Sequence, residues 1–340
     1  MNDLLTKFSH RILSDRKLTQ LLVIAVITFS SFSLLSKDIF FSGSNFTSMA
    51  YQIPEIAILS MAVMLSMLTG GIDLSIVAIS NAAALVAAYI MTHHEYAKGE
   101  NVYLWILFSC LIGIVVGLLC GLVNSVLISI LEVTPILATL ATLTLFNGIA
   151  IGATGGKANS GLPEEFLRLG NGTFLGIPTP FIIMLIVAGI LGIFVNRSGI
   201  GLKIFLIGTN RKAAQYSVMG DRKVIAITYL VSALLSSIAG LVIASRTSAA
   251  SPDFGSSYIL LAIVIVVLGG VNPNGGFGTI TGVVVATAVL QFVSSGFNAL
   301  RFSQFFYLIS QGAVLILVMV LNVLVDRGLS ARSKSKAIGN

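Results

Sequence analysis

Long apolar segments recur along almost the whole chain, separated by short polar connections. Only 10% of the 340 residues are charged and 56% are apolar, whereas soluble globular chains carry about 25% charged residues. About 20 apolar residues can cross the hydrocarbon core of a membrane as a helix, which satisfies its own backbone hydrogen bonds. The chain is therefore predicted to be an all-α, polytopic membrane protein that forms one domain over residues 1–340.

We expect about ten membrane spans. Their approximate bounds are 18–35, 52–68, 74–91, 102–131, 136–154, 181–195, 225–244, 258–268, 279–297 and 305–325. A count of eight or nine is compatible with the same pattern, because the spans at 74–91 and 258–268 are the weakest of the ten. No small-residue cleavage site follows the basic N-terminus, so the first span is expected to stay uncleaved.

Positive charge is concentrated in three segments. Fourteen of the twenty Lys and Arg residues lie in 1–17, 197–223 and 327–340. Cations close to apolar spans mark the cytoplasmic side of a membrane. Both termini and the loop at 197–223 are therefore expected in the cytoplasm. The segment 155–180 is expected outside, where a periplasmic partner could dock.

The loop at 197–223 contains a predicted short helix at 210–217 (NRKAAQYS). Asn210 can act as its N-cap, Ala213 and Ala214 favour helix, and Gly220 can end it. Such a helix could be held by a cytosolic partner. A basic loop that only fixes the topology is an equally good explanation of the charges.

Two glycine-rich segments interrupt the apolar pattern, TGGIDLS at 69–75 and LGGVNPNGGFG at 268–278. Their helix-breaking glycines are Gly70, Gly71, Gly269, Gly270, Gly275 and Gly276. Discontinuous helices commonly line transport sites. Asp73 can cap the helix that follows the first break. As an ionisable residue at membrane depth, it is also a candidate for a translocation pathway or a partner interface, and both roles can hold.

Small and polar residues mark two further spans. Gly113, Gly117 and Gly121 form a small-xxx-small row that predicts close helix packing, with Asn124 one turn beyond. The next span carries several polar residues, namely Thr139, Thr142, Thr144 and Asn147. Packing explains them by default, and a polar stripe along a water-filled pathway is the alternative.

Several classes of function are disfavoured. Cys110 and Cys120 lie in one span, about 15 Å apart along a helix, which is too far for a disulfide. The three histidines have no Cys or paired carboxylates nearby, so no metal site is expected. The glycine-rich segments lack the Lys-Ser/Thr of a phosphate loop. The net charge of +7 lies mostly beside apolar spans and does not predict nucleic-acid binding.

Three motifs, in this order and spacing, resemble the permease subunits of ribose-type and autoinducer-type sugar ABC importers. They are TGGIDLS at 69–75, GTNRKAAQYS at 208–217 and VVLGGVNPNGGFGTITG at 266–282. The similarity covers about residues 20–326. One departure follows Ser217, where this chain has Val218 and Met219 in place of the usual Gly-Ile. That departure leaves open where the short helix ends and which ATPase subunit it fits.

The resemblance implies a bacterial inner-membrane subunit without catalytic chemistry or a cofactor of its own. ATP would be bound by a partner ABC ATPase. A periplasmic binding protein would deliver the sugar, and a second permease copy or a sister permease would complete a homo- or heterodimer. The coupling helix would contact the ATPase through Gly208, Asn210, Ala213, Ala214 and Ser217. The pathway and helix-break candidates are Asp73, Gly70, Gly71, Asn124, Thr142, Asn147, Gly269, Gly270, Gly275 and Gly276.

The substrate implied is ribose or a similar pentose, with an autoinducer-type furanosyl compound second and branched-chain amino acids third. An ion-coupled secondary transporter is the main alternative of a different class. It would need ionisable residues inside the membrane, and only Asp73 and Glu55 lie within or beside the early spans. A membrane enzyme would need clustered His, Asp or Glu residues, which the sequence does not suggest.

Overall fold

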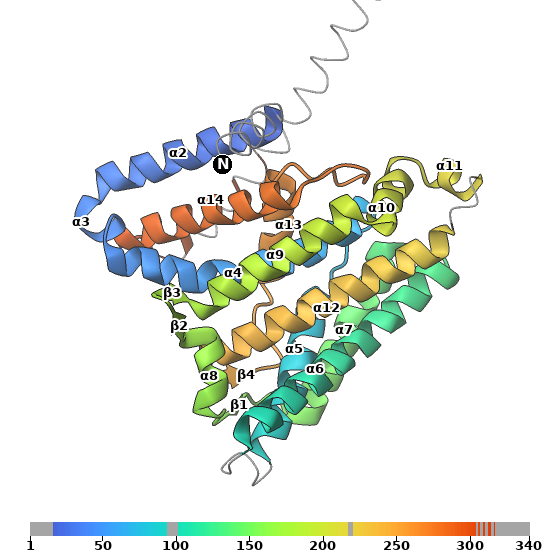
Figure 1. The fold of residues 1–340 in the computed structure, drawn as a ribbon, viewed down its shortest axis with the longest axis horizontal. Helices are drawn as coiled ribbons and strands as arrows, with labels where there is room; N and C mark the ends of the chain where they lie inside the picture. Colours follow the sequence, from blue (N-terminus) through green and yellow to red (C-terminus); the bar gives the residue numbers. More distant parts are fainter. Residues whose placement is uncertain are drawn as a thin grey trace, which may run out of the picture.

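A computed structural model describes residues 16–93, 101–216 and 220–303, together with residues 305, 306, 309, 312, 313 and 316 (Figure 1). The tail at 327–340, most of the predicted span at 305–325 and the site candidate Ser217 lie outside the described residues.

The described chain is mostly helical. Its long helices are α2 (Arg16–Leu35), α4 (Gly43–Leu68), α6 (Val102–Ser125), α7 (Pro135–Thr154), α9 (Thr179–Arg197), α12 (Asp221–Thr247) and α14 (Ile280–Ala299). The shorter helices are α3 (Lys37–Phe40), α5 (Ile76–Thr92), α8 (Glu164–Asn171), α10 (Gly199–Thr209), α11 (Arg211–Tyr216) and α13 (Tyr258–Leu268), and a π-helix, η2 (Val126–Ile130), continues α6.

Four two-residue strands form two antiparallel pairs, and all lie in connections between helices. β1 (Asn159–Ser160) pairs with β4 (Ala249–Ala250), and β2 (Thr173–Phe174) pairs with β3 (Ile177–Pro178). Figure 1 shows α3, α8 and these strands at one end of the molecule and α10 and α11 at the other. We refer to these as the α8 end and the α11 end. The long helices run between them.

Seven helices in the described part are long and apolar enough to cross a membrane. This supports the predicted polytopic all-α class, whereas the predicted count of about ten is not confirmed. The 11 residues of α13 extend about 16 Å, roughly half of a ~30 Å hydrocarbon core. Both α13 and the 17-residue α5 adjoin a glycine-rich break.

Two predicted connections contain more helix than expected. α4 begins at Gly43 rather than at Gln52, because the Ser42 hydroxyl caps it by accepting a hydrogen bond from the N–H of Asn45 at 3.3 Å. The basic loop contains an apolar helix, α10, before the predicted short helix. Ser198 caps α10 by accepting from the N–H of Gly201 at 2.9 Å. In both places a serine cap lets a helix begin within a stretch that was predicted to be a connection.

α4 forms the centre of the bundle. Every residue from Ile53 to Leu68 is buried, as expected of a helix that is apolar all round. α9, α12, α13 and α14 pack against it. In contrast, α6, α7 and α9 expose large apolar side chains such as Leu107, Leu137 and Ile190, which suits helices that face lipid.

The predicted small-residue row on α6 packs closely against its neighbours, as expected. A side chain at Gly113 would collide with the backbone of Ala83 on α5, and one at Gly117 or Gly121 would collide with Ser237 or Ala233 on α12. Small residues thus let α6 approach two helices at backbone distance.

Candidate functional site

The two glycine-rich breaks meet at the α11 end. The backbone N–H of Gly276, in the second break, donates a hydrogen bond of 3.0 Å to the carbonyl oxygen of Leu68, the last residue of α4. A Cβ atom added to Gly275 would lie 2.7 Å from the nitrogen of Gly70. Gly70 and Gly275 have φ angles of 82° and 92°, a region that glycine adopts without strain. Backbone contacts two hundred residues apart in sequence therefore join the breaks.

Gly208 of α10 lies at the same place. A side chain at Gly208 would collide with the carbonyl oxygen of Leu68 and with the nitrogen of Gly276. A Cβ at Gly276 would also come within 2.9 Å of the backbone of Thr209, the last residue of α10. We call this meeting of Leu68, Gly70, Gly208, Gly275 and Gly276 the glycine junction. It joins three segments that the sequence motifs singled out separately.

Two further glycines of the breaks pack elsewhere. Gly71 lies under the Tyr229 hydroxyl of α12, which would be 2.6 Å from an added Cβ. Gly269 lies against the backbone of Gly282 in the first turn of α14, at 2.9 Å by the same measure. Gly270 has a φ of 84° and turns the chain after α13. Gly71 thus packs the first break against α12, and Gly269 packs the second break against α14.

Asp73 is buried in the first break, with 1% of its surface exposed. Its Oδ1 accepts hydrogen bonds from the backbone N–H of Ser75 at 2.9 Å and from the Ser75 hydroxyl at 2.6 Å. Its Oδ2 accepts from the Ser232 hydroxyl of α12 at 3.4 Å. The predicted N-cap role of Asp73 is wrong, because Ser75 occupies the N-cap position of α5. Asp73 lies two residues earlier and stabilises the turn that leads into the helix.

The polar candidates Asn124 and Thr142 belong to the same hydrogen-bonded chain. The Asn124 side-chain amide donates to the Ser75 hydroxyl at 2.7 Å, and the Thr142 hydroxyl donates to the Asn124 carbonyl oxygen at 2.7 Å. All are buried. Asn147 is only partly buried, farther along α7. The chain from Asp73 to Thr142 therefore connects α5, α6 and α7 inside the protein.

α11 forms at the predicted position. The Asn210 side chain accepts a hydrogen bond of 3.0 Å from the N–H of Ala213, which confirms the predicted N-cap. Gly220, with a φ of 64°, directly precedes α12. Ala213 is exposed, whereas Ala214 is buried in the same apolar cluster as Val224 of α12. The two alanines therefore face different surroundings, Ala213 the surface and Ala214 the apolar interior.

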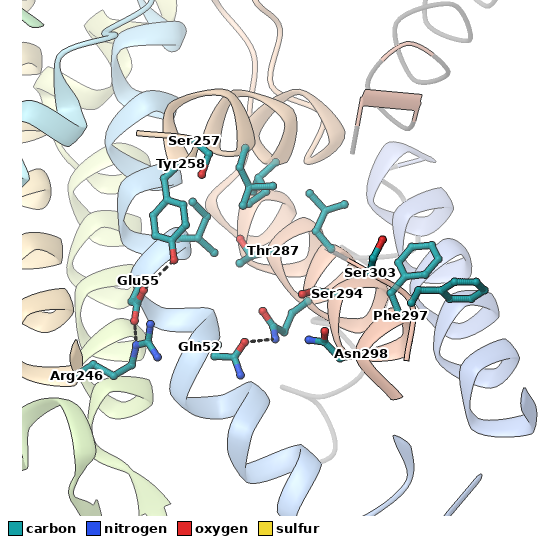
Figure 2. A pocket seen from close by; sticks show the side chains of 16 residues that line it. Gln52, Glu55, Arg246, Ser257, Tyr258, Thr287, Ser294, Phe297, Asn298 and Ser303 are labelled. Atoms are coloured by element: carbon teal, nitrogen blue, oxygen red, sulfur yellow. Dashed lines mark hydrogen bonds and ion pairs between the residues drawn. The ribbon is translucent and has the colours of Figure 1, made fainter. Parts of the chain in front are cut away.

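A pocket of about 340 Å³ lies among α4, α13, α14 and the final turn of α12 (Figure 2). Glu55 of α4 forms an ion pair with Arg246 of α12 in its wall. The Tyr258 hydroxyl donates to Glu55 Oε2 at 3.4 Å, and the Gln291 amide donates to Gln52 Oε1 at 3.2 Å. Polar groups from four helices thus converge here.

This pocket was not predicted from the sequence. The seventh span was expected to end at Ala244, which would leave Arg246 in a polar connection. In the structure α12 continues to Thr247 and places Arg246 beside Glu55. A glutamate and an arginine near the ends of two apolar segments were the available signal, because charges inside a membrane protein usually pair.

Helix α8 fixes two walls of this pocket. The N–H of Gly170 donates to the Ser245 hydroxyl at 2.7 Å, and the Asn171 amide donates to the Ser245 carbonyl oxygen at 2.9 Å. Tyr51 of α4 donates through its hydroxyl to the Asn171 carbonyl oxygen at 3.1 Å. The contacted residues directly precede Arg246 and Gln52 in sequence. The segment predicted to be external is therefore hydrogen-bonded to α4 and α12, two of the helices that line the pocket.

Comparison with known proteins identifies the family. The branched-chain amino acid transport system / permease component family matches residues 45–319. The chain is 35% identical over 295 residues to the ribose import permease protein RbsC of Bacillus subtilis (strain 168), covering 86% of this chain and 87% of that one. It is 31% identical over 312 residues to the autoinducer 2 import system permease protein LsrD of Escherichia coli (strain K12), covering 89% and 90%. No solved structure matches. The chain belongs to this permease family.

Proposed function

We propose that the chain is the membrane permease subunit of an ATP-driven importer that brings a sugar into a bacterial cell. The relatives are named for the import of ribose and of autoinducer 2. Ribose or a similar pentose is therefore the first substrate to test, and an autoinducer-type furanosyl compound the second. A periplasmic binding protein delivers the sugar. A separate ABC subunit binds and hydrolyses ATP, and a second copy or a sister permease completes the pathway.

The glycine junction is the observation that best supports a permease driven by a separate ATPase. Two residues, Thr209 and Asn210, separate Gly208 from α11, and the backbone of Gly208 packs against Leu68 and Gly276. In the proposed importer α11 is the coupling helix and lies in the cytoplasm. When the ATPase moves α11, Gly208 displaces the inner ends of α4 and α14 together. Because backbone atoms are in contact, little of this displacement is absorbed by flexible side chains.

The same two helices carry the movement to the pocket. Leu68 at the junction and Glu55 at the pocket are both on α4, about 20 Å apart along the helix. On α14, Thr279 caps the helix beside the second break, and Gln291 lies at the pocket. ATP binding and hydrolysis would thus shift the population between two packings of α4 and α14, and so between outward-open and inward-open states.

An ion-coupled transporter is disfavoured by the same residues. Coupling to a proton gradient needs an ionisable group that is free to bind and release the proton. Glu55 is paired with Arg246, and Asp73 accepts bonds from Ser75 and Ser232 inside the protein. Neither carboxylate is left free for this purpose.

The test is reconstitution of the chain in proteoliposomes with the ATPase and binding protein encoded beside it. Labelled D-ribose and the binding protein are supplied outside, and ATP is trapped inside. We expect uptake that needs ATP and the ATPase and that persists when ionophores collapse the proton and sodium gradients. Uptake that needs no ATP and stops with the ionophores would establish the secondary transporter instead. Competition with autoinducer 2 ranks the two substrates.

A further inference from the structure

We propose that the pocket among α4, α13 and α14 is a transit site that recognises a neutral, polyhydroxylated molecule. Gln52, Gln291 and Asn298 supply the recognising amides, and the Glu55–Arg246 pair keeps the wall without net charge. This inference rests on the proposed function. It adds selectivity inside the membrane subunit itself, beyond that of the binding protein.

The lining of the pocket suits a sugar. Side-chain amides both donate and accept hydrogen bonds, as sugar hydroxyls do. Figure 2 shows Gln52, Glu55 and Arg246 on one side and Thr287, Ser294, Asn298 and Ser303 on the other. Phe297 and Phe302 add apolar surface for the C–H groups of a sugar ring. A small molecule between the walls would meet amides and hydroxyls from both α4 and α14.

The size is also appropriate. The pocket has a volume of about 340 Å³. A water molecule occupies about 30 Å³ in the liquid, so the pocket has room for about eleven waters, and a monosaccharide fits into it.

The charges determine which class of molecule is accepted. Among the described residues that line the pocket, Glu55 and Arg246 are the two that carry a charge, and they are bonded to one another. Glu55 is 1% exposed, so breaking the pair would leave a buried charge without a partner, at high cost. An amino acid or a sugar phosphate needs an opposite charge for each of its own charges when it leaves water. This wall has none to offer, whereas a neutral sugar needs none.

The position of the pocket fits a transit role. Its lining includes the first residue of α13, the last full turn of α14 and the last turn of α12. All are at the α8 end, and α8 holds the backbone of Arg246 through the hydrogen bonds of Asn171. A molecule released at that end would reach this pocket before the glycine junction, which lies at the opposite end of α4.

The first test compares Asn298→Leu, which removes an amide from the pocket, with the matched control Asn196→Leu, at an exposed asparagine of α9 that does not line the pocket. Both are measured in the reconstituted importer with saturating binding protein and D-ribose. We expect Asn298→Leu to lower the number of ribose molecules imported per ATP hydrolysed by roughly tenfold, the effect of losing a hydrogen bond to a desolvated ligand. ATP hydrolysis stimulated by the binding protein should persist, and Asn196→Leu should keep the wild-type ratio. A wild-type ratio in Asn298→Leu would overturn the transit site.

The second test addresses the ion pair. Glu55→Gln leaves the Arg246 charge unpaired, and we expect roughly tenfold less ribose uptake. The double variant Glu55→Gln with Arg246→Gln removes both charges and should recover most of the uptake. If the double variant is as inactive as the single one, neutrality of the wall is not the role of the pair. Failure of the wild-type chain to import ribose with ATP would be a different result, since it would count against the proposed function rather than against the pocket alone.

Discussion

The carbonyl oxygen of Leu68 accepts a hydrogen bond from the N–H of Gly276 at 3.0 Å, with the Cα of Gly208 packed against both residues. This contact joins the end of α4 to the loop between α13 and α14. Two residues separate Gly208 from α11. In the proposed mechanism, this contact transmits a movement of α11 to α4 and α14, two helices that line the pocket at the other end.

Gly208→Ala should uncouple or destabilise this junction. Its methyl group would meet the Leu68 oxygen and the Gly276 nitrogen, and such overpacking costs about 1–3 kcal/mol. We expect a lower melting temperature in detergent and a loss of ATP-dependent uptake. Gly199→Ala, in the first turn of the same helix, is the matched control because an added methyl there meets nothing within 4 Å. Normal uptake by Gly208→Ala would mean that the junction can open without functional consequence.

Gly117→Leu should prevent close packing of α6 on α12, because even a Cβ at Gly117 collides with Ser237. We expect less folded protein to be recovered in detergent, since the added side chain forces the helices apart. Gly148→Leu on α7 is the control, since nothing lies within 4 Å of a Cβ at Gly148. Size-exclusion chromatography of both variants measures the folded yield. Equal yields would place this face of α6 against lipid.

Asp73→Asn should reduce stability. The carboxylate accepts hydrogen bonds from Ser75 on one oxygen and from Ser232 on the other, and an amide cannot accept on both atoms. A buried hydrogen-bonding group left without its partner costs about 1–3 kcal/mol, so the melting temperature should fall. Unchanged stability with reduced uptake would instead assign the charge of Asp73 a direct role in the transport cycle.

Cysteine labelling tests the predicted sidedness. Thr209 and Asn171 are exposed at opposite ends of the molecule, in α10 and α8. In a background without Cys110 and Cys120, an impermeant thiol reagent applied to intact spheroplasts should label Asn171→Cys and not Thr209→Cys, because the cations near α11 favour the cytoplasm. The reverse pattern would invert the topology.

Much of this architecture could be predicted from sequence, because hydropathy and glycine act locally. Apolar length identified seven helices, and the glycine pairs identified both breaks at the right residues. The starts of α4 and α10 were not predicted. Each helix begins directly after a capping serine, Ser42 or Ser198, inside a segment that was expected to be a connection. Asp73 illustrates the same limit. An aspartate side chain can accept a hydrogen bond from a backbone N–H either at the start of a helix or in the turn before it, and the sequence does not distinguish the two.

The candidate sites divide in the same way. The sequence motifs singled out Gly70, Gly208 and Gly275 individually, but their contact depends on how α4, α10 and the second break pack, which no local pattern encodes. The pocket went unrecognised because Arg246 and Gln291 are ordinary residues until α12 and α14 bring them beside α4. Ala214 was expected on a docking face, and its burial against α12 became evident only from the tertiary structure.

The two alanines of α11 provide the most direct test of the central claim that α11 transmits ATP-driven movement. Ala213 is exposed and Ala214 is buried. We expect Ala213→Glu to abolish co-purification of the ATPase while the permease keeps its melting temperature. Ala214→Glu should lower the melting temperature of the permease itself, through a buried unpaired charge. Full ATPase binding and full ATP-dependent uptake in Ala213→Glu would contradict the account and reduce α11 to a connection that only fixes the topology.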